Sequence, residues 1–338
     1  MSRNIENRQE LIKANSLHDE VSSKNGKLIL ISHKSCIGIY LIQDTRLTGV
    51  FAMPKDTRSG EIILGRVSNI KKDISAAFIK ISDNTECFMK LSNVPDEYLP
   101  LKQGMLIPVK IRSDEQKGKL ISVTARIKKG KLPEGWEHKS AFTVLFKPEN
   151  SLMSFISARV SPTEYDEIVT DSKEIQEMLA ATDIAVRLYS DDKIGLSELY
   201  ALKTKLSESL SRKVYMKSGA FLIIDHTEAF TVIDVNSGKN TPSDKADTGN
   251  VILRLNLEAA KETALQIKLR NISGMILIDF INMDSKEDED KLIGSMNEFI
   301  SDEKVKVNVI DITPLGIMEM TRQKTDKPLS EIATLLEM

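Results

Sequence analysis

Strands and helices alternate through the last third of the chain, and this order limits the folds open to the chain more than any other feature. β-prone runs at residues 220–224 and 229–233 flank a short polar segment and predict a hairpin. The elements expected after it are a helix with one apolar face, a strand at 275–281, an acidic amphipathic helix at 285–302, a strand at 305–312 and a short helix after Pro314. This alternation predicts an α/β domain.

Two of these strands carry an acidic residue in an apolar setting. Asp234 follows the apolar run 230–233, and Asp279 has apolar residues on both sides. Burying a carboxylate in such a strand is costly unless something offsets its charge. Asn236 lies two residues after Asp234, so both side chains point to the same side of an extended chain. Asp234, Asn236 and Asp279 therefore form a hypothetical site with two oxygen ligands for a hard cation.

The Ile-Asp dipeptide occurs twice more, at Asp225 and Asp311, where a turn role is the simpler interpretation. Asp225 precedes a turn and Asp311 lies at a strand end before Pro314, and an acid at such positions commonly bonds the backbone. The residue pattern alone leaves two alternatives open. Either Asp234 and Asp279 form a metal site, or the two acids are unrelated to each other.

Residues 59–127 have a different texture, with five short strands at close spacing. The runs lie at 62–70, 76–81, 86–89, 105–111 and 119–124. Such a series fits a small closed barrel of the OB kind. Phe78 and Phe88 either stack against unpaired bases or fill the barrel core, and the sequence leaves both roles open.

A basic stretch from Lys110 to Lys131 overlaps the end of this barrel. It holds eight Lys and Arg residues, opposed by only two acids. Such a run suits phosphate binding, with Lys117 or Lys119 as the contact. The alternative is a solvated face without a ligand.

The composition excludes several classes of protein. The chain has 338 residues, of which 41% are hydrophobic and 28% charged, values typical of globular proteins. The N-terminus lacks an apolar signal core and no apolar run reaches membrane-spanning length, so we expect a cytoplasmic location and no membrane partner. Cys36 and Cys87 match no zinc spacing and are expected to be buried free thiols. The four histidines are scattered, so any metal must be held by oxygen.

The segments on either side of the barrel are expected to contribute further strands and helices. Strands are predicted at 27–32, 36–42 and 47–53 before the barrel, and at 142–146, 164–169 and 185–189 after it. Helices are predicted at 173–181 and 196–212, the second with one apolar stripe formed by Leu199, Leu202, Leu206 and Leu210.

Five motifs follow one another in the C-terminal part of the chain: residues 233–239, 256–262, 266–274, 278–283 and 316–323. In that order they closely resemble the catalytic core of the RNase E/G family of bacterial endoribonucleases, over most of residues 214–326. The barrel is similar to the S1-type RNA-binding domain that precedes this core in the family, through residues 65–67, 76–79 and 87–89.

The resemblance implies a multidomain α+β and α/β architecture. An RNase H-like subdomain, discontinuous over 27–58 and 164–218, would hold the inserted S1-type OB-fold barrel at 59–127. A DNase I-like catalytic subdomain would follow at 219–338. The remaining segments are expected to be a polar lead-in at 1–26 and a reduced remnant of the family's 5′-sensor domain at 128–163.

The resemblance also implies a chemistry. The family's site residues fall on Asp234 and Asp279 as ligands of a Mg²⁺ ion, with Mn²⁺ as a substitute, and on Asn236, which orients the first carboxylate. Mg²⁺ binds through one or two carboxylates plus water and substrate phosphates, so this sparse set is chemically adequate. The implied reaction is hydrolysis of single-stranded RNA, an mRNA or rRNA precursor, by a metal-activated water, leaving a 5′-phosphate and a 3′-hydroxyl. Candidates for holding the RNA backbone, or else plain surface charges, are Lys239, Arg270 and Arg322.

The chain departs from the family pattern at three points. No Arg-Thr pair of the kind that grips a 5′-monophosphate occurs in residues 128–163, so cleavage is expected not to depend on that group. The Cys-Pro-x-Cys zinc link is absent before Met338, so we expect at most a homodimer and no zinc-bridged tetramer. Asn282 replaces an aspartate, which weakens the local negative charge.

The alternative to a nuclease is an RNA-binding protein with a degenerate, inactive core, against which the retained Asp234, Asn236 and Asp279 argue. A phosphate loop at Gly238 and Lys239 is excluded because the glycine-rich lead-in of that motif is absent. The sequence therefore predicts a Mg²⁺-dependent endoribonuclease.

Overall fold

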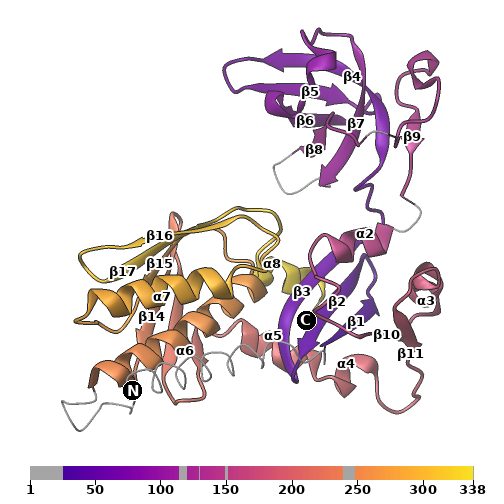
Figure 1. Cartoon of the computed structure of the whole chain (residues 1–338). Coiled ribbons are helices and arrows are strands. Elements are labelled where there is room, and N and C mark those ends of the chain that lie inside the picture. Colours follow the sequence, from indigo (N-terminus) through magenta and orange to yellow (C-terminus); the bar gives the residue numbers. More distant parts are fainter. Residues whose placement is uncertain (1–25, 114–119, 129, 149–150, 239–247, 338) are drawn as a thin grey trace, which may run out of the picture. The chain divides into compact units, whose positions relative to one another are not determined.

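A computed structural model describes residues 26–113, 120–128, 130–148, 151–238 and 248–337 (Figure 1). The chain divides into two compact units. One unit is Met53–Ala158, and the other combines the segments on either side of it, Met1–Ala52 and Arg159–Met338. The predicted polar lead-in lies outside the described residues except for its last member, Gly26, which begins the first strand.

The unit Met53–Ala158 contains a closed barrel of five strands. These are β4 (Ile62–Lys71), β5 (Ala76–Lys80), β6 (Glu86–Lys90), β7 (Leu106–Ser113) and β8 (Ile121–Thr124). The sheet order is β5-β6-β8-β7-β4, and a further pairing of β5 with β4 closes the ring. The predicted OB-like barrel is therefore confirmed. Short 3₁₀ turns lie at Leu91–Asn93, Asp96–Tyr98 and Trp136–His138.

Residues that follow the barrel in sequence extend its sheet. The short strand β9 (Val144–Phe146) pairs antiparallel with β4, outside the closed ring. Leu145 packs there against Ile62 and Leu64, and helix α2 (Ser151–Ser157) ends the unit. In the described part of residues 128–163, β9 is thus joined to the barrel through backbone pairing with β4.

The second unit holds a five-stranded sheet built from two separate stretches of sequence. Its strands are β1 (Gly26–Ser32), β2 (Cys36–Gln43), β3 (Arg46–Pro54), β10 (Glu167–Thr170) and β11 (Ala185–Leu188), in the order β11-β10-β1-β2-β3. β10 runs parallel to β1 and β11, whereas β2 runs antiparallel to β1. Both predicted free thiols are buried, and burial raises the pKa of the Cys87 thiol, which lies in the barrel, to about 12.

One helix predicted beside this sheet is wrong in its extent. In place of a continuous helix over 196–212 the structure has α4 (Leu196–Leu199) and α5 (Leu202–Ser209), with Ala201 between them at a left-handed φ of 49°. The break directs Leu202 into the core but leaves Leu199 49% exposed. The preceding helix, α3 (Lys173–Leu179), begins at the predicted residue, directly after its N-cap Ser172, and ends two residues before the predicted end.

The same unit holds a six-stranded sheet in the C-terminal part of the chain. Its strands are β12 (Lys213–Tyr215), β13 (Phe221–His226), β14 (Phe230–Asn236), β15 (Gly274–Asp279), β16 (Val307–Ile312) and β17 (Ile317–Arg322), in the order β12-β13-β14-β15-β17-β16. β13 and β14 form the predicted hairpin, and β14 and β15 are the one parallel pair in this sheet. Helices α6 (Thr248–Leu269) and α7 (Lys286–Phe299) lie side by side over one face (Figure 1).

The short helix predicted after Pro314 is wrong, because that segment is strand β17. Its residues alternate between half-buried and buried positions, with Met318 and Met320 in the core beneath α6 and α7. A period of two residues is that of a strand, and the two methionines fit this period better than a helical one. The helix of this region lies further on, at α8 (Leu329–Leu335), and packs with Leu269 in the core of the five-stranded sheet.

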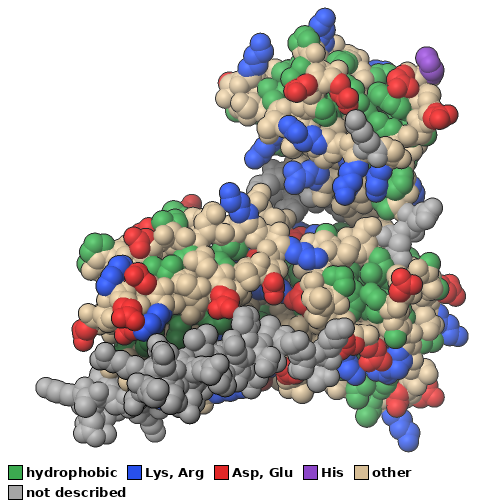
Figure 2. All heavy atoms as spheres, in the orientation of Figure 1, with side chains coloured by type: hydrophobic (Ala, Val, Ile, Leu, Met, Phe, Trp, Pro, Cys, Tyr) green, Lys and Arg blue, Asp and Glu red, His purple; other side chains and the backbone are tan. Residues whose placement is uncertain are grey.

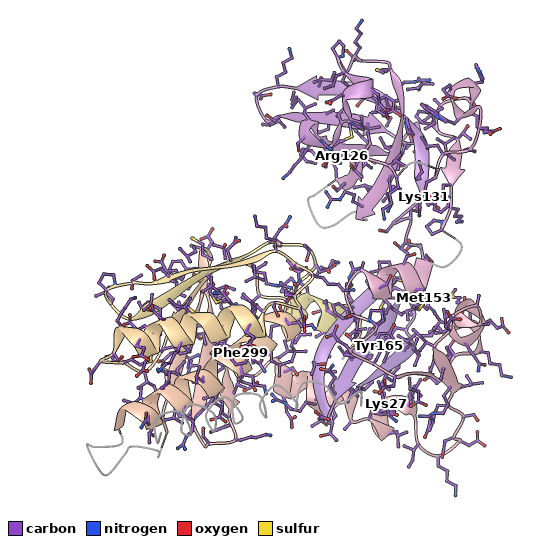
Figure 3. All side chains as sticks on the ribbon, in the orientation of Figure 1. Lys27, Arg126, Lys131, Met153, Tyr165 and Phe299 are labelled. Atoms are coloured by element: carbon purple, nitrogen blue, oxygen red, sulfur yellow. The ribbon has the colours of Figure 1, made fainter. Side chains whose placement is uncertain are left out.

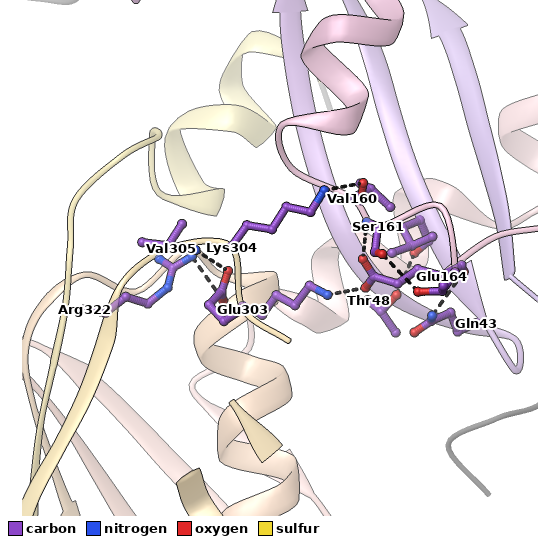
Figure 4. A network of polar contacts seen from close by, with 12 residues as sticks. Gln43, Thr48, Val160, Ser161, Glu164, Glu303, Lys304, Val305 and Arg322 are labelled. Carbon is purple, nitrogen blue, oxygen red and sulfur yellow. Dashed lines mark hydrogen bonds and ion pairs between the residues drawn. The ribbon is translucent and has the colours of Figure 1, made fainter. Parts of the chain in front are cut away.

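Polar contacts join the two sheets of this unit (Figure 4). Lys268 on α6 pairs with Glu164, and Lys304 donates to the carbonyl of Val160 at 2.9 Å. A bidentate ion pair also links Arg46 on β3 with Glu262 on α6, at 2.8 and 3.0 Å.

Among the described residues, no helix is both long and apolar enough to traverse a membrane.

Candidate functional site

Asp234 and Asp279 lie next to each other at the ends of two neighbouring parallel strands. Their Cα atoms are register partners in the pairing of β14 with β15. In β14 the alternating residues Ile233 and Val235 are buried in the core under the helices, so Asp234 and Asn236 point to the opposite face. We call this face, formed by the side chains that alternate with core residues, the outer face of the six-stranded sheet.

On the outer face, the two acids are less buried than their apolar sequence neighbours suggest. Asp279 is exposed and Asp234 is half-buried. The prediction that apolar neighbours enclose Asp279 is wrong, because strand alternation turns those neighbours inward and the carboxylate outward. Neither carboxylate forms an ion pair with a lysine or arginine in the described part of the chain. Ion pairing within the described residues therefore does not explain why the two acids lie at these positions.

Asn236 contacts the first of these carboxylates. Its Nδ2 donates a hydrogen bond of 2.8 Å to Oδ2 of Asp234. The two residues lie on the same face because they are two positions apart in a strand. The amide thereby restricts the rotation of the Asp234 carboxylate and occupies one of its two oxygens.

The donor set suits a hard cation with a sparse protein shell. Two carboxylates on adjacent strands face the same side, and the described residues contain no cluster of three or more His, Cys, Asp or Glu side chains with the geometry of a metal site. Mg²⁺ keeps several waters and commonly uses one or two carboxylates plus substrate phosphates. The residues present thus fit Mg²⁺ better than a cation that needs an all-protein cage.

Asn256 supports the end of β15, although its role cannot be read from the sequence pattern. It is fully buried in α6, where Nδ2 donates to the carbonyl of Ile281 at 2.8 Å and Oδ1 accepts from the Ile281 amide at 3.1 Å. Both backbone groups of a residue just past Asp279 are therefore held by one side chain. The available signal was a polar residue set within the apolar face of the helix.

The other two acids of the Ile-Asp type are used differently. Arg212 donates two hydrogen bonds to the Asp225 carboxylate, at 2.5 and 2.6 Å, and this pairing holds the pKa of Asp225 below its usual range. Asp311 is exposed and accepts a hydrogen bond of 2.8 Å from the backbone of Ile312. Both acids thus have local partners, although for Asp225 the partner is an arginine instead of the backbone.

The barrel presents an aromatic pair on its outside. Phe78 on β5 and Phe88 on β6 are register partners, with ring centroids 6.2 Å apart in an edge-to-face arrangement. Both are half-buried and absent from the barrel core, which their neighbours Ala77, Ile79, Cys87 and Met89 help to fill. The ammonium of Lys71 lies 5.6 Å from the Phe78 ring centroid. Of the two roles that the sequence leaves open, core filling is excluded by this placement.

Positive charge is concentrated on the same unit. Burial lowers the pKa of Lys110, and so do the charges of Lys131, Lys128 and Arg112 close to it. Figure 2 shows Lys and Arg side chains gathered on one side of this unit, and Figure 3 marks Lys131 and Arg126 there. These cations form a local surface suited to phosphate groups. The predicted contacts Lys117 and Lys119 lie outside the described residues.

The sequence is similar to proteins of a known family. A family model described as "Ribonuclease E/G family" matches residues 131–325, which is more than half of the chain. The chain belongs to the ribonuclease E/G family. The match contains both acids of the outer face, whereas the barrel precedes it.

Individual relatives agree with the family match. The chain is 40% identical to Ribonuclease E of Synechocystis sp. (strain ATCC 27184 / PCC 6803 / Kazusa) over 141 residues, which is 42% of this chain and 21% of that protein. It is 36% identical to Ribonuclease G of Salmonella typhimurium over 135 residues, 40% of this chain and 27% of that protein. For Ribonuclease G of Haemophilus influenzae the identity is 34% over 194 residues, 55% of this chain and 38% of that protein. The chain thus spans well under half of the length of these relatives.

Two arginines that the sequence offers as candidate RNA contacts, or else as plain surface charges, lie in the interior. Arg270 is 6% exposed and donates to Gln266 Oε1 and to the carbonyl of Ser211, each at 2.7 Å. Arg322 is 5% exposed and donates to Asn271 Oδ1 at 2.6 Å, with Glu303 at 3.4 Å. Both placements favour a structural role over a surface contact. The third candidate, Lys239, lies outside the described residues.

Proposed function

We propose that this member of the ribonuclease E/G family is a Mg²⁺-dependent endoribonuclease that hydrolyses phosphodiesters in single-stranded RNA, an mRNA or rRNA precursor. The observation that carries the proposal is the register of Asp234 with Asp279 at the ends of adjacent parallel strands. Two carboxylates on one face, free of ion pairs with described cations, suit a cation shared with a substrate phosphate.

The side chains have separate roles in this proposal. Asp234 and Asp279 hold the ion, and Asn236 fixes the first carboxylate through its hydrogen bond of 2.8 Å. Asn256 holds the backbone after Asp279. When bound, Mg²⁺ supplies an activated water and offsets charge on the phosphate in the transition state. The products carry a 5′-phosphate and a 3′-hydroxyl, and Mn²⁺ substitutes for Mg²⁺.

The barrel supplies RNA affinity in this proposal. Phe78 and Phe88 offer ring surfaces to unpaired bases, and the cations around Lys110 attract the phosphates. Aromatic rings beside basic side chains are the usual composition of a single-strand binding surface. We include Lys117, Lys119 and Lys239 as further phosphate contacts, and leave out Arg270 and Arg322 because both are buried.

The proposal also assigns the two sheets and the barrel to known types of fold. We infer that the five-stranded sheet is the RNase H-like subdomain, that the six-stranded sheet is the DNase I-like subdomain, and that the barrel is of the S1 type.

Cleavage of an unstructured RNA labelled at either end tests the function. Wild-type protein is expected to cut internally in Mg²⁺ or Mn²⁺ and to be inactive in excess chelator, with 5′-phosphate and 3′-hydroxyl ends on the products. If the protein binds this RNA in Mg²⁺ and in Mn²⁺ without cutting it, the proposal is wrong and the alternative, an RNA-binding protein with an inactive core, is correct.

A second test concerns the 5′ end of the substrate. No Arg-Thr pair occurs in residues 128–163, so we predict equal cleavage rates on 5′-monophosphate and 5′-triphosphate forms of one RNA. The measurement is the initial rate on each form at matched subsaturating concentration. A strong preference for the monophosphate would contradict the prediction.

A further inference from the structure

Two aromatic side chains share one row of the outer face at the β12 edge of the six-stranded sheet. Tyr215 on the edge strand β12 and Phe221 on β13 are register partners, with ring centroids 6.0 Å apart and planes tilted by 56°. Tyr215 is 68% exposed, whereas its neighbours Val214 and Met216 pack against the core. Strand alternation therefore holds a large ring in solvent between two neighbours that pack into the core.

A lysine joins the two rings. Lys213 Nζ lies 3.6 Å from the ring centroid of Phe221 and 4.6 Å from that of Tyr215. A cation over a ring face is attracted by the ring quadrupole, so the contact restrains the lysine and both rings together. The result is a compact group with two π surfaces and one positive charge.

The strand register places this group beside the two acids. Phe221 is the partner of Asn236, and Ile223, two residues further along β13, is the partner of Asp234. The aromatic row is therefore the next row on the same face after the row that contains Asp234 and Asp279. Adjacent strands are about 5 Å apart and successive residues on one face about 7 Å apart, so Tyr215, two strands and one row away from Asp234, lies roughly 12 Å from it. A short stretch of single-stranded RNA on this face can therefore reach both groups.

We propose that Tyr215, supported by Phe221 and Lys213, is a base-stacking subsite for an unpaired nucleotide close to the phosphate that the cation at Asp234 and Asp279 would hold. The inference rests on the proposed function. Stacking on an aromatic ring accepts any base, and Lys213 offers a charge to the flanking phosphate. The subsite would thus position single-stranded RNA along the outer face, separately from the barrel.

A stacked RNA base and a second copy of the chain would contact different groups of β12. An edge strand that pairs with another strand uses its backbone groups, and a side-chain ring is not required. Replacing the ring while keeping an apolar side chain therefore separates the two. Loss of RNA contact indicates stacking, whereas a change in oligomeric state alone indicates strand pairing.

The test uses the full chain with Ca²⁺ in place of Mg²⁺, under conditions where the wild type is first shown not to cut, so that binding is measured with a cation present and without cleavage. The variants are Tyr215→Leu, which removes the π surface, Tyr215→Phe, which retains it, and Phe299→Leu as a control. Phe299 is an aromatic residue at the end of α7, a helix on the opposite side of the sheet, and is 37% exposed (Figure 3). A single-stranded RNA with 5-iodouracil at successive positions is irradiated, and the cross-linked peptides are identified by mass spectrometry.

We expect a cross-link on Tyr215 in the wild type, and retention of RNA binding with Tyr215→Phe and with Phe299→Leu. Tyr215→Leu is expected to weaken RNA binding by about 5- to 100-fold, from the usual contribution of stacking per base. An abasic strand should bind wild type and Tyr215→Leu equally. The inference is overturned by equal RNA affinity of wild type and Tyr215→Leu, by no cross-link at Tyr215, or by no RNA binding at all. Failure to cut in Mg²⁺ despite this stacking contact would refute the proposed function alone.

Discussion

Single residues of the candidate site depend on contacts that the sequence shows only in part. The pairing of Asn236 with Asp234 is expected from their separation of two in a strand, and the structure has that hydrogen bond. The exposure of Asp279 is not predictable from its apolar neighbours, because composition does not tell which face of a strand is covered. The two bonds between Asn256 and Ile281 join residues 25 apart, beyond the reach of any local pattern.

Asn256→Leu provides a test at this scale. The substitution removes both hydrogen bonds and leaves the Ile281 amide and carbonyl without their partner, so we expect the free energy of unfolding to fall by about 1–3 kcal/mol. Cleavage should fall as well at a temperature where the variant is folded, because the backbone after Asp279 loses its support. Denaturant unfolding and cleavage rates are the measurements. Asn297→Leu is the control, since that side chain is exposed and, among the described residues, bonds only a carbonyl of its own helix.

At the scale of elements, periodicity predicted most strands of the barrel and of both sheets. It was wrong where an apolar spacing fitted two structures: residues 196–212 break into α4 and α5, and the segment after Pro314 is β17. In both cases the packing of buried residues such as Leu202 and Met318 decided the outcome. The closed barrel was predictable because five short strands at close spacing have few other ways to remove their edges.

The turn after β14 requires a glycine at position 238. Its φ is 64°, and a Cβ atom built there would lie 2.6 Å from the carbonyl oxygen of Gly219. Gly238→Ala is therefore expected to lower the free energy of unfolding by more than about 1 kcal/mol. Gly294→Ala is the matched control, because a Cβ at this exposed position in α7 meets nothing within 4 Å. That control should raise the free energy of unfolding by about 0.5–1 kcal/mol. Equal effects of the two substitutions in denaturant unfolding would show that the close approach at Gly238 is not needed.

On the scale of the whole molecule, the sequence predicted separate segments better than the contacts between them. The five-stranded sheet takes strands from both sides of the unit Met53–Ala158, an arrangement suggested by the family resemblance and not by periodicity. Contacts such as that of Arg46 with Glu262 join residues 216 apart, and no local rule specifies them. Tyr215 was missed for a related reason, because its neighbours are known only once the register of β12 with β13 is fixed.

The Arg46–Glu262 pair should stabilise the packing of the two sheets in its unit. The Glu262 side chain is only 9% exposed and also accepts from Gln266, so removing its partner leaves a largely buried charge. We expect Arg46→Ala to lower the free energy of unfolding by about 1–3 kcal/mol. Adding Glu262→Gln should restore part of that loss, which a double-mutant cycle in denaturant unfolding measures. Additive effects would show that the pair contributes nothing beyond its separate residues.

The central claim is that Asp234 and Asp279 together hold the catalytic ion. The most direct measurement is the Mg²⁺-dependent cleavage rate of Asp234→Asn and Asp279→Asn, with RNA affinity measured in chelator. Asp311→Asn is the control, because this acid shares the Ile-Asp signature but lies in another strand and bonds the backbone. We predict that each site variant loses cleavage by at least about 100-fold while it folds and binds RNA, and that Asp311→Asn cleaves like the wild type. Wild-type cleavage by either site variant would contradict the account.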